Sequence, residues 1–130
     1  MADSQTCATG SCLCGAVSYE VDRPLRDVVV CHCAMCRKTH GHYAAYSAAA
    51  KSALRMTEAY GLRWYQSSPD ARRGFCGECG GSVFWSRCRS ITFQSPPGRW
   101  DAPTGLKTTM QIFVDDAGDY YELPNVPVRI

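Results

Sequence analysis

The sequence lacks any apolar run long enough to span a membrane, and residues 1–5 (MADSQ) are neither basic nor apolar. A membrane helix needs about 20 consecutive apolar residues, and a signal peptide needs a basic start followed by an apolar segment. Because neither pattern is present, we expect a cytoplasmic protein that does not contact a membrane.

An excess of charge of one sign is also missing. The chain has 14 basic and 12 acidic residues, which gives a net charge of +2. Nucleic-acid-binding proteins usually present a concentrated basic face. The arginines that could contribute to such a face are few: Arg72, Arg73, Arg87 and Arg89. We therefore expect no nucleic-acid partner.

Internal repeats and low-complexity segments are absent as well. A length of 130 residues with 45% apolar content is typical of one domain with a modest core. The sequence therefore predicts a single domain over residues 1–130.

Cysteine, by contrast, is abundant, with nine residues of which seven fall into three close-spaced blocks. An odd number of cysteines cannot pair completely within the chain, and the cytoplasm keeps thiols reduced. Metal ligation is therefore favoured over disulfides. Cys7 and Cys88 lie outside the blocks, and a lone cysteine is more often a packing or surface residue than a ligand.

The central block is Cys31-His32-Cys33-Ala34-Met35-Cys36, which offers three thiols within six residues. A structural zinc site usually has four protein ligands, whereas a catalytic site has three and keeps one position open. A three-sulfur group therefore points to catalysis. His32, His40 or His42 would close the site if one of them were a fourth ligand, but each is better explained as a supporting or solvated residue, because thiolates already supply three ligands.

The other two blocks are Cys12-Leu13-Cys14 and Cys76-Gly77-Glu78-Cys79. Each is followed by glycine, which permits the tight turns that aim two sulfurs at one ion. Cys76 and Cys79 would also suit a redox dithiol, but the motif opens no evident helix. Together the two blocks predict a four-sulfur structural zinc site.

Most of the chain shows the pattern of short strands. Strands are predicted by the alternation of apolar and polar residues at 17–21 and by the β-branched run 28–30. A hairpin is predicted over 62–75, and further short strands at 83–85, 91–93 and 110–114. Residues 37–42 are polar and indicate a turn. Alanines favour helix over 43–54, in conflict with the strands around that segment.

These blocks, taken with their flanking residues, identify a family resemblance. The segments 10–15 (GSCLCG), 31–37 (CHCAMCR) and 75–80 (FCGECG) resemble the glutathione-dependent formaldehyde-activating enzyme and centromere protein V family. The resemblance implies a mainly β, Mss4-like fold in which small antiparallel sheets are clipped by zinc. It also implies strand, not helix, over 43–54.

The resemblance further implies two zinc ions per chain. Cys12, Cys14, Cys76 and Cys79 would hold a structural ion, and Cys31, Cys33 and Cys36 a catalytic one. The implied activity is that of a carbon–sulfur lyase acting on thiol–aldehyde adducts, with glutathione and formaldehyde as partners. Arg37 is a candidate anchor for the thiol's carboxylate, against the alternative of an ordinary solvated loop arginine. The alternative is a non-catalytic, zinc-stabilised binding or chaperone-like module. Gln111 departs from the family, in which many members carry histidine at that position.

Overall fold

Two β-sheets make up most of the structure, a computed structural model that describes residues 6–129. The three-stranded sheet contains, in spatial order, β1 (Cys7–Ser11), β2 (Ser18–Asp22) and β5 (Leu54–Glu58). The seven-stranded sheet contains, in spatial order, β10 (Thr108–Ile112), β3 (Arg26–Cys31), β4 (Ala44–Ala50), β9 (Thr92–Ser95), β8 (Ser82–Arg87), β7 (Ala71–Cys76) and β6 (Leu62–Ser68). One α-helix, α1 (Ala34–His40), and 3₁₀ turns at Lys51–Ala53, Pro97–Arg99 and Val114–Asp116 complete the regular structure of the described residues.

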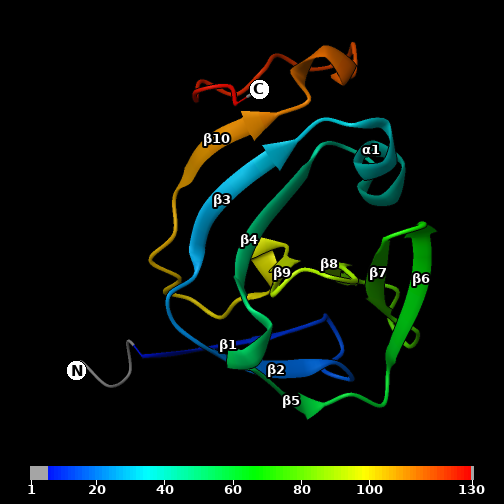
Figure 1. Cartoon of the computed structure of the whole chain (residues 1–130), viewed down its shortest axis with the longest axis vertical. Helices are drawn as coiled ribbons and strands as arrows, with labels where there is room; N and C mark the ends of the chain where they lie inside the picture. Colours follow the sequence, from blue (N-terminus) through cyan, green and yellow to red (C-terminus); the bar gives the residue numbers. More distant parts are fainter. Residues whose placement is uncertain (1–5, 130) are drawn as a thin grey trace.

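The seven-stranded sheet is strongly curved, with its edge strands β10 and β6 on opposite sides of the view in Figure 1. In that view β10, β3 and β4 form one wall, the β6–β7 hairpin forms the other, and α1 lies near the upper end of both. Neighbouring strands run antiparallel, except that β10 runs parallel to β3. The prediction of a mainly β fold with antiparallel sheets is confirmed, and β10 is a parallel addition to it.

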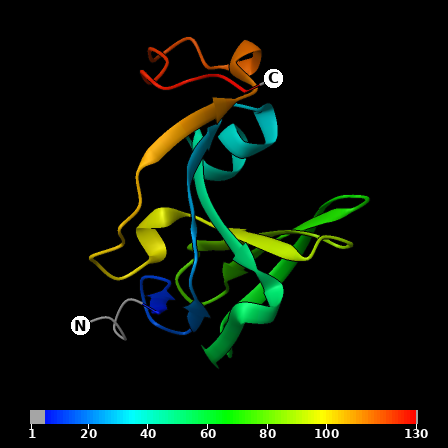
Figure 2. The same cartoon turned by 60° about the vertical axis from the view of Figure 1, so that its left-hand side comes forward.

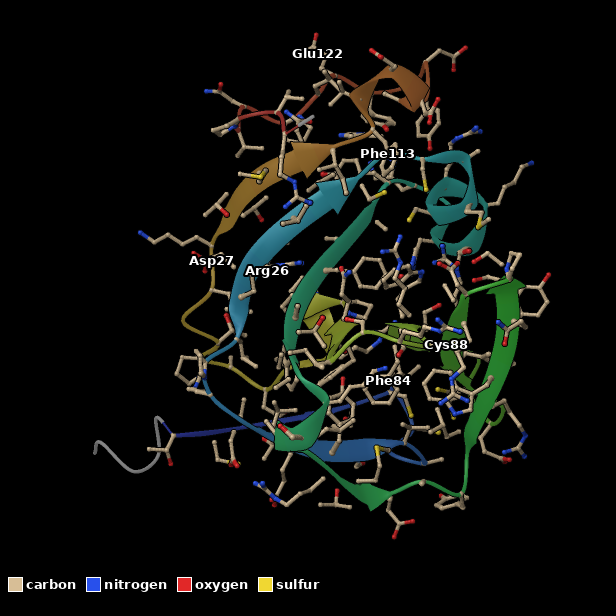
Figure 3. The ribbon with its side chains drawn as sticks, viewed as in Figure 1. Arg26, Asp27, Phe84, Cys88, Phe113 and Glu122 are labelled. Atoms are coloured by element: carbon tan, nitrogen blue, oxygen red, sulfur yellow. The ribbon has the colours of Figure 1, made fainter. Side chains whose placement is uncertain are left out.

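The core lies between the two sheets, and the alternation predicted at residues 17–21 points into it. Tyr19 and Val21 are fully buried on β2. The Tyr19 ring packs against the rings of Phe84 and Trp100, at centroid distances of 4.9 and 5.2 Å. Phe84 points into the interior of the molecule in Figure 3. Aromatic packing of this kind joins the small sheet to the large one.

The alanine-rich segment forms strand β4, as the family resemblance implied. β4 pairs with β3 on one side and β9 on the other, so its backbone groups are satisfied in the middle of the sheet. Its small side chains suit this position, because Ala44, Ala48 and Ala49 are buried. The strand ends at residue 50, and 51–53 form a 3₁₀ turn before β5 begins. Tertiary pairing therefore overrides helical propensity.

The turn predicted at residues 37–42 is wrong, because residues 34–40 form helix α1. The Cys33 sulfur accepts a hydrogen bond from the backbone N–H of Cys36 and caps the first turn. Gly41, with φ of 80°, ends the helix in the left-handed region, where glycine is favoured. Cys33 is therefore the N-cap of α1, and the spacing of Cys33 and Cys36 allows this capping hydrogen bond.

The chain after β10 crosses the upper end of the molecule as an irregular tail, visible from a second direction in Figure 2. The tail begins at Phe113, whose φ of 57° is in the left-handed region that non-glycine residues rarely adopt. Over residues 6–129, no helix has the length and apolar character that crossing a membrane would need.

Candidate functional site

Four of the predicted metal-ligating cysteines come together where the two sheets meet. The Sγ atoms of Cys12, Cys14, Cys76 and Cys79 all lie within 4.8 Å of one another. The Sγ of Cys14 is 3.8 Å from that of Cys12 and 3.7 Å from that of Cys76. Zinc–sulfur bonds of about 2.3 Å place the sulfurs of a tetrahedral site about 3.8 Å apart. The donor set and its spacing therefore fit zinc.

Backbone N–H groups donate hydrogen bonds to the sulfurs of Cys12 and Cys76, the first of them from Val17 at 3.4 Å. Cys76 ends β7, and its Sγ accepts hydrogen bonds from the N–H groups of Glu78 (3.3 Å) and Cys79 (3.4 Å). The N–H of Gly81 lowers the pKa of the Cys79 thiol to about 6. The motif forms a tight turn and not the start of a helix, as expected for a zinc knuckle.

Gly61 is required beside this four-sulfur group for steric reasons. A Cβ atom at this position would lie 2.7 Å from the Cβ of Ala16 and 2.9 Å from the Sγ of Cys76. The backbone of Gly61 also accepts a hydrogen bond from the N–H of Gly77 (2.7 Å). The loop before β6 therefore closes tightly against the cysteine turn.

The other three predicted ligands form a second sulfur group at the end of β3. Cys31 is the last residue of β3 and pairs with Ala44 on one side and Ile112 on the other, so its position in the sheet is fixed. Cys33 and Cys36 lie at the cap and in the first turn of α1. The three Sγ atoms lie within 4.8 Å of one another, which also fits one zinc ion.

A cavity of about 300 Å³ adjoins the three-sulfur group. All three cysteines line it, together with the side chains of Tyr46, Arg73, Trp85 and Phe113. Phe113 lies near the start of α1 in Figure 3. Cavities of this size are at the lower end of those that bind small molecules. The three sulfurs therefore face a space that can hold a ligand.

Arg73, which the sequence suggested only as part of a basic face, instead lines this cavity. Its side chain is buried, with Nη2 at 3.9 Å from the Cys36 Sγ and Nη1 donating to the Tyr46 hydroxyl at 3.3 Å. Its Nε is buried and has no hydrogen-bond partner, and the ion pairs found over residues 6–129 do not include it. A buried cation is costly unless negative charge lies nearby. The Cys36 sulfur, 3.9 Å from Nη2, supplies that negative charge when it is a thiolate.

Arg73 and the neighbouring thiols change the acidity of Cys36. A hydrogen bond from the Cys31 thiol, together with the Arg73 guanidinium, lowers the pKa of Cys36 to about 6. The pKa of the Cys31 thiol is raised because it donates that hydrogen bond. The group is therefore arranged to hold negative charge on sulfur at neutral pH.

The Tyr46 hydroxyl links Arg73 to His40. The His40 Nε2 lies 2.7 Å from this hydroxyl. Burial raises the pKa of Tyr46, and burial with the nearby Arg73 charge lowers the pKa of His40 to about 4. Both groups are therefore neutral at pH 7. His40 contacts the lining residue Tyr46 but does not itself line the cavity.

His32 and Gln111 form a separate buried network that faces away from the sulfurs. His32 is fully buried, and its Nε2 lies 2.9 Å from the Gln111 Oε1 while its Nδ1 lies 2.6 Å from the Tyr121 hydroxyl. Both ring nitrogens are therefore occupied by other partners. His42 stacks on Tyr43 with a centroid distance of 4.4 Å.

The remaining residues raised by the sequence lie elsewhere. Arg37 is half-buried on α1 and is not among the residues that line the cavity. Cys7 and Cys88 are free thiols in neither sulfur group. Among the arginines considered for a basic face, Arg73 is buried and the Arg72 guanidinium lies 3.8 Å from the Trp64 ring centroid. Arg87 pairs with Asp70 at 3.8 Å, and the exposed Arg89 lies beside this pair.

Comparison with known proteins agrees with the fold and the cysteine pattern. A crystal structure of a Rhodobacter sphaeroides protein, a structural genomics target, is 26% identical over 93% of this chain and 99% of its own, with a TM-score of 0.62. No curated protein matched the sequence. The family described as glutathione-dependent formaldehyde-activating enzyme matches residues 7–116, a range that contains both sulfur groups. The chain therefore belongs to the glutathione-dependent formaldehyde-activating enzyme family.

Proposed function

We propose that the chain is a zinc-dependent enzyme of the carbon–sulfur lyase type, which joins a small thiol to a small aldehyde and reverses that reaction. The observation that supports this most directly is the group of three cysteine sulfurs in the wall of a cavity. Three protein ligands leave a position for a substrate on a metal ion. Glutathione and formaldehyde, which the family description names, are the proposed substrates.

We further propose that the two sulfur groups have different roles. Cys12, Cys14, Cys76 and Cys79 would hold a structural zinc, because four thiolates complete a tetrahedral site between the two sheets. Cys31, Cys33 and Cys36 would hold a catalytic zinc. Free cysteines throughout the chain favour a reducing compartment, so we propose a cytoplasmic location.

The proposed reaction uses side chains on the cavity wall. The thiol sulfur forms a bond to the carbonyl carbon, and the carbonyl oxygen takes up the proton that the thiol has released; the reverse reaction breaks the carbon–sulfur bond. A bound zinc ion supplies Lewis acidity and lowers the pKa of a thiol ligand. Arg73 stabilises negative charge on the sulfur. With neutral His40 in the tautomer that carries its proton on Nε2, the Tyr46 hydroxyl accepts from both His40 and Arg73 and keeps its own proton to donate to the aldehyde oxygen. Because Arg73 lines the cavity and Arg37 does not, we propose Arg73 also as the anchor for the thiol's carboxylate, the role that the sequence suggested for Arg37.

Two zinc ions of unequal affinity are expected in the purified, reduced protein. Four thiolates close one site, whereas three hold the other and leave it accessible from the cavity. Metal analysis should give two ions per chain, and a mild chelator should remove one of them early. A single tightly held zinc in protein whose seven clustered thiols are all reduced would refute the two-site assignment.

Glutathione binding to the cobalt-substituted protein tests the proposed function. Sulfur-to-cobalt charge-transfer bands report each thiolate on the metal, so millimolar glutathione should change these bands in the wild type. The response should disappear in Cys33→Ser, which lacks one ligand of the three-sulfur group. An unchanged wild-type spectrum would instead favour a non-catalytic binding module in which both cysteine groups are structural.

A further inference from the structure

The metal-binding loop of β3 and α1 is attached to the C-terminal tail through the side chain of His32. This residue stands between Cys31 and Cys33 and is fully buried. Its ring stacks on the Tyr121 ring at a centroid distance of 5.5 Å and an interplanar angle of 15°. Its backbone N–H donates to the Ile112 carbonyl at 3.2 Å. Both the side chain and the backbone of the loop are therefore held by residues near the end of the chain.

Gln111 determines the direction of the hydrogen bonds in this network. Its Nε2 donates to the carbonyl oxygens of Pro124 (2.8 Å) and Val126 (2.9 Å), so its Oε1 is an acceptor. The His32 Nε2 must then carry the proton that it donates to Oε1, at 2.9 Å. The His32 Nδ1 consequently accepts from the Tyr121 hydroxyl, at 2.6 Å.

The chain of hydrogen bonds is continuous and complete. The Tyr121 oxygen, which donates to His32, also accepts from the N–H of Gly118 at 3.3 Å. Gln111 is 2% exposed, so breaking the network would leave buried polar groups without partners. Displacement of the His32 ring would therefore break its hydrogen bonds to Tyr121 and Gln111, which are themselves held by the backbone of Gly118, Pro124 and Val126.

The geometry connects this network to the metal site. A rotation of the peptides on either side of His32 would move the Cys31 and Cys33 sulfurs and would also break the bonds to Gln111 and Tyr121. Residues that fix a ligand's orientation through a neighbouring group strengthen metal binding and preorganise a site. Tyr121, Pro124 and Val126 all lie after residue 116, where the family match ends. The network therefore depends on a part of the chain that the family pattern does not cover.

We propose that Tyr121 and Gln111 are positioning residues for the three-cysteine metal site and act on Cys31 and Cys33 through His32. The proposal rests on the proposed function only in assigning a metal ion to that site. By holding the loop in one arrangement, the tail slows loss of the ion and keeps the three sulfurs directed at it.

Zinc release from the loaded full-length protein tests this proposal. A chromophoric chelator should show a fast phase from the three-sulfur site and a slow phase from the four-sulfur site. Tyr121→Phe removes one oxygen atom and should speed the fast phase at least tenfold while leaving the slow phase unchanged. Tyr120→Phe is the matched control, because its hydroxyl makes no hydrogen bond in the network, and it should release zinc as the wild type does.

A second variant and a spectrum separate positioning from general stability. Gln111→Met keeps the side-chain length but removes every hydrogen bond of the amide, so it should speed the same phase further. Both variants should also alter the charge-transfer bands of cobalt at the three-sulfur site. Unchanged fast-phase rates, or equal acceleration of both phases, would overturn the proposal. A wild type that binds one ion would overturn the proposed function, and this inference with it.

Discussion

Replacing Cys76 with serine is expected to unfold the chain at room temperature. Cys76 is fully buried, ends β7, and contributes one of four sulfurs that join the two sheets. Structural zinc contributes about 10–16 kcal/mol in zinc-finger peptides, which is comparable with the about 5–15 kcal/mol that stabilises an ordinary domain. Circular dichroism of Cys76→Ser should therefore show loss of the native spectrum even with added zinc.

Cys33→Ser and Cys88→Ser are the matched controls for this experiment. Cys33 belongs to the three-sulfur group, so its loss should lower the melting temperature only moderately and release one ion. Cys88 is exposed and belongs to neither group, so its replacement should leave stability unchanged. Equal destabilisation by Cys76→Ser and Cys33→Ser would refute the division into structural and catalytic sites.

Arg73→Met is expected to weaken thiol binding tenfold to a hundredfold, with the larger loss for thiols that carry a carboxylate. Three thiolates and one zinc ion carry a net charge of −1, and an incoming thiolate adds another negative charge. The Arg73 guanidinium, 3.9 Å from the Cys36 sulfur, offsets part of that charge. Hydrogen bonds to charged groups contribute about 1.5–3 kcal/mol, which corresponds to the predicted range of affinity.

Calorimetric titration of 3-mercaptopropionate and its methyl ester would measure this effect, because the two thiols differ in charge and hardly in length. The wild type should prefer the acid, and Arg73→Met should remove that preference. Arg72→Met is the control, since Arg72 lies over Trp64 and does not line the cavity. If Arg73→Met bound both thiols with wild-type affinity, Arg73 would have no role in substrate binding.

Most of the fold and both sulfur groups could be predicted from the sequence, because close-spaced cysteines and β-branched runs act locally. The short helix α1 could not, because two turns are too few to show a helical period and its cap is a cysteine. Alternation along β7 places Arg72 and Arg73 on opposite faces, but only the curl of the sheet determines which face is inside.

Gln111 illustrates a second limit of the sequence. A glutamine in place of the family's histidine suggests the loss of an ionisable group close to the chemistry. In the structure its side chain instead faces His32 and the tail. Its partners Pro124 and Val126 lie 13 and 15 residues further along an irregular segment, and no local pattern predicts that approach.

The spacing of the two sulfur groups along the chain affects how the protein acquires metal during synthesis. A ribosome releases the chain from its N-terminus, so the cluster from Cys31 to Cys36 emerges complete within six residues. The four-sulfur group is incomplete until Cys76 has been synthesised, 62 residues after Cys14. Under the proposed assignment, the nascent chain can therefore capture the weakly held ion first, before the ion that stabilises the fold has all of its ligands. Because the four-sulfur site holds its ion more tightly, an ion captured early by the three-sulfur cluster can still pass to it, and zinc-poor growth should yield folded chains that lack the catalytic metal.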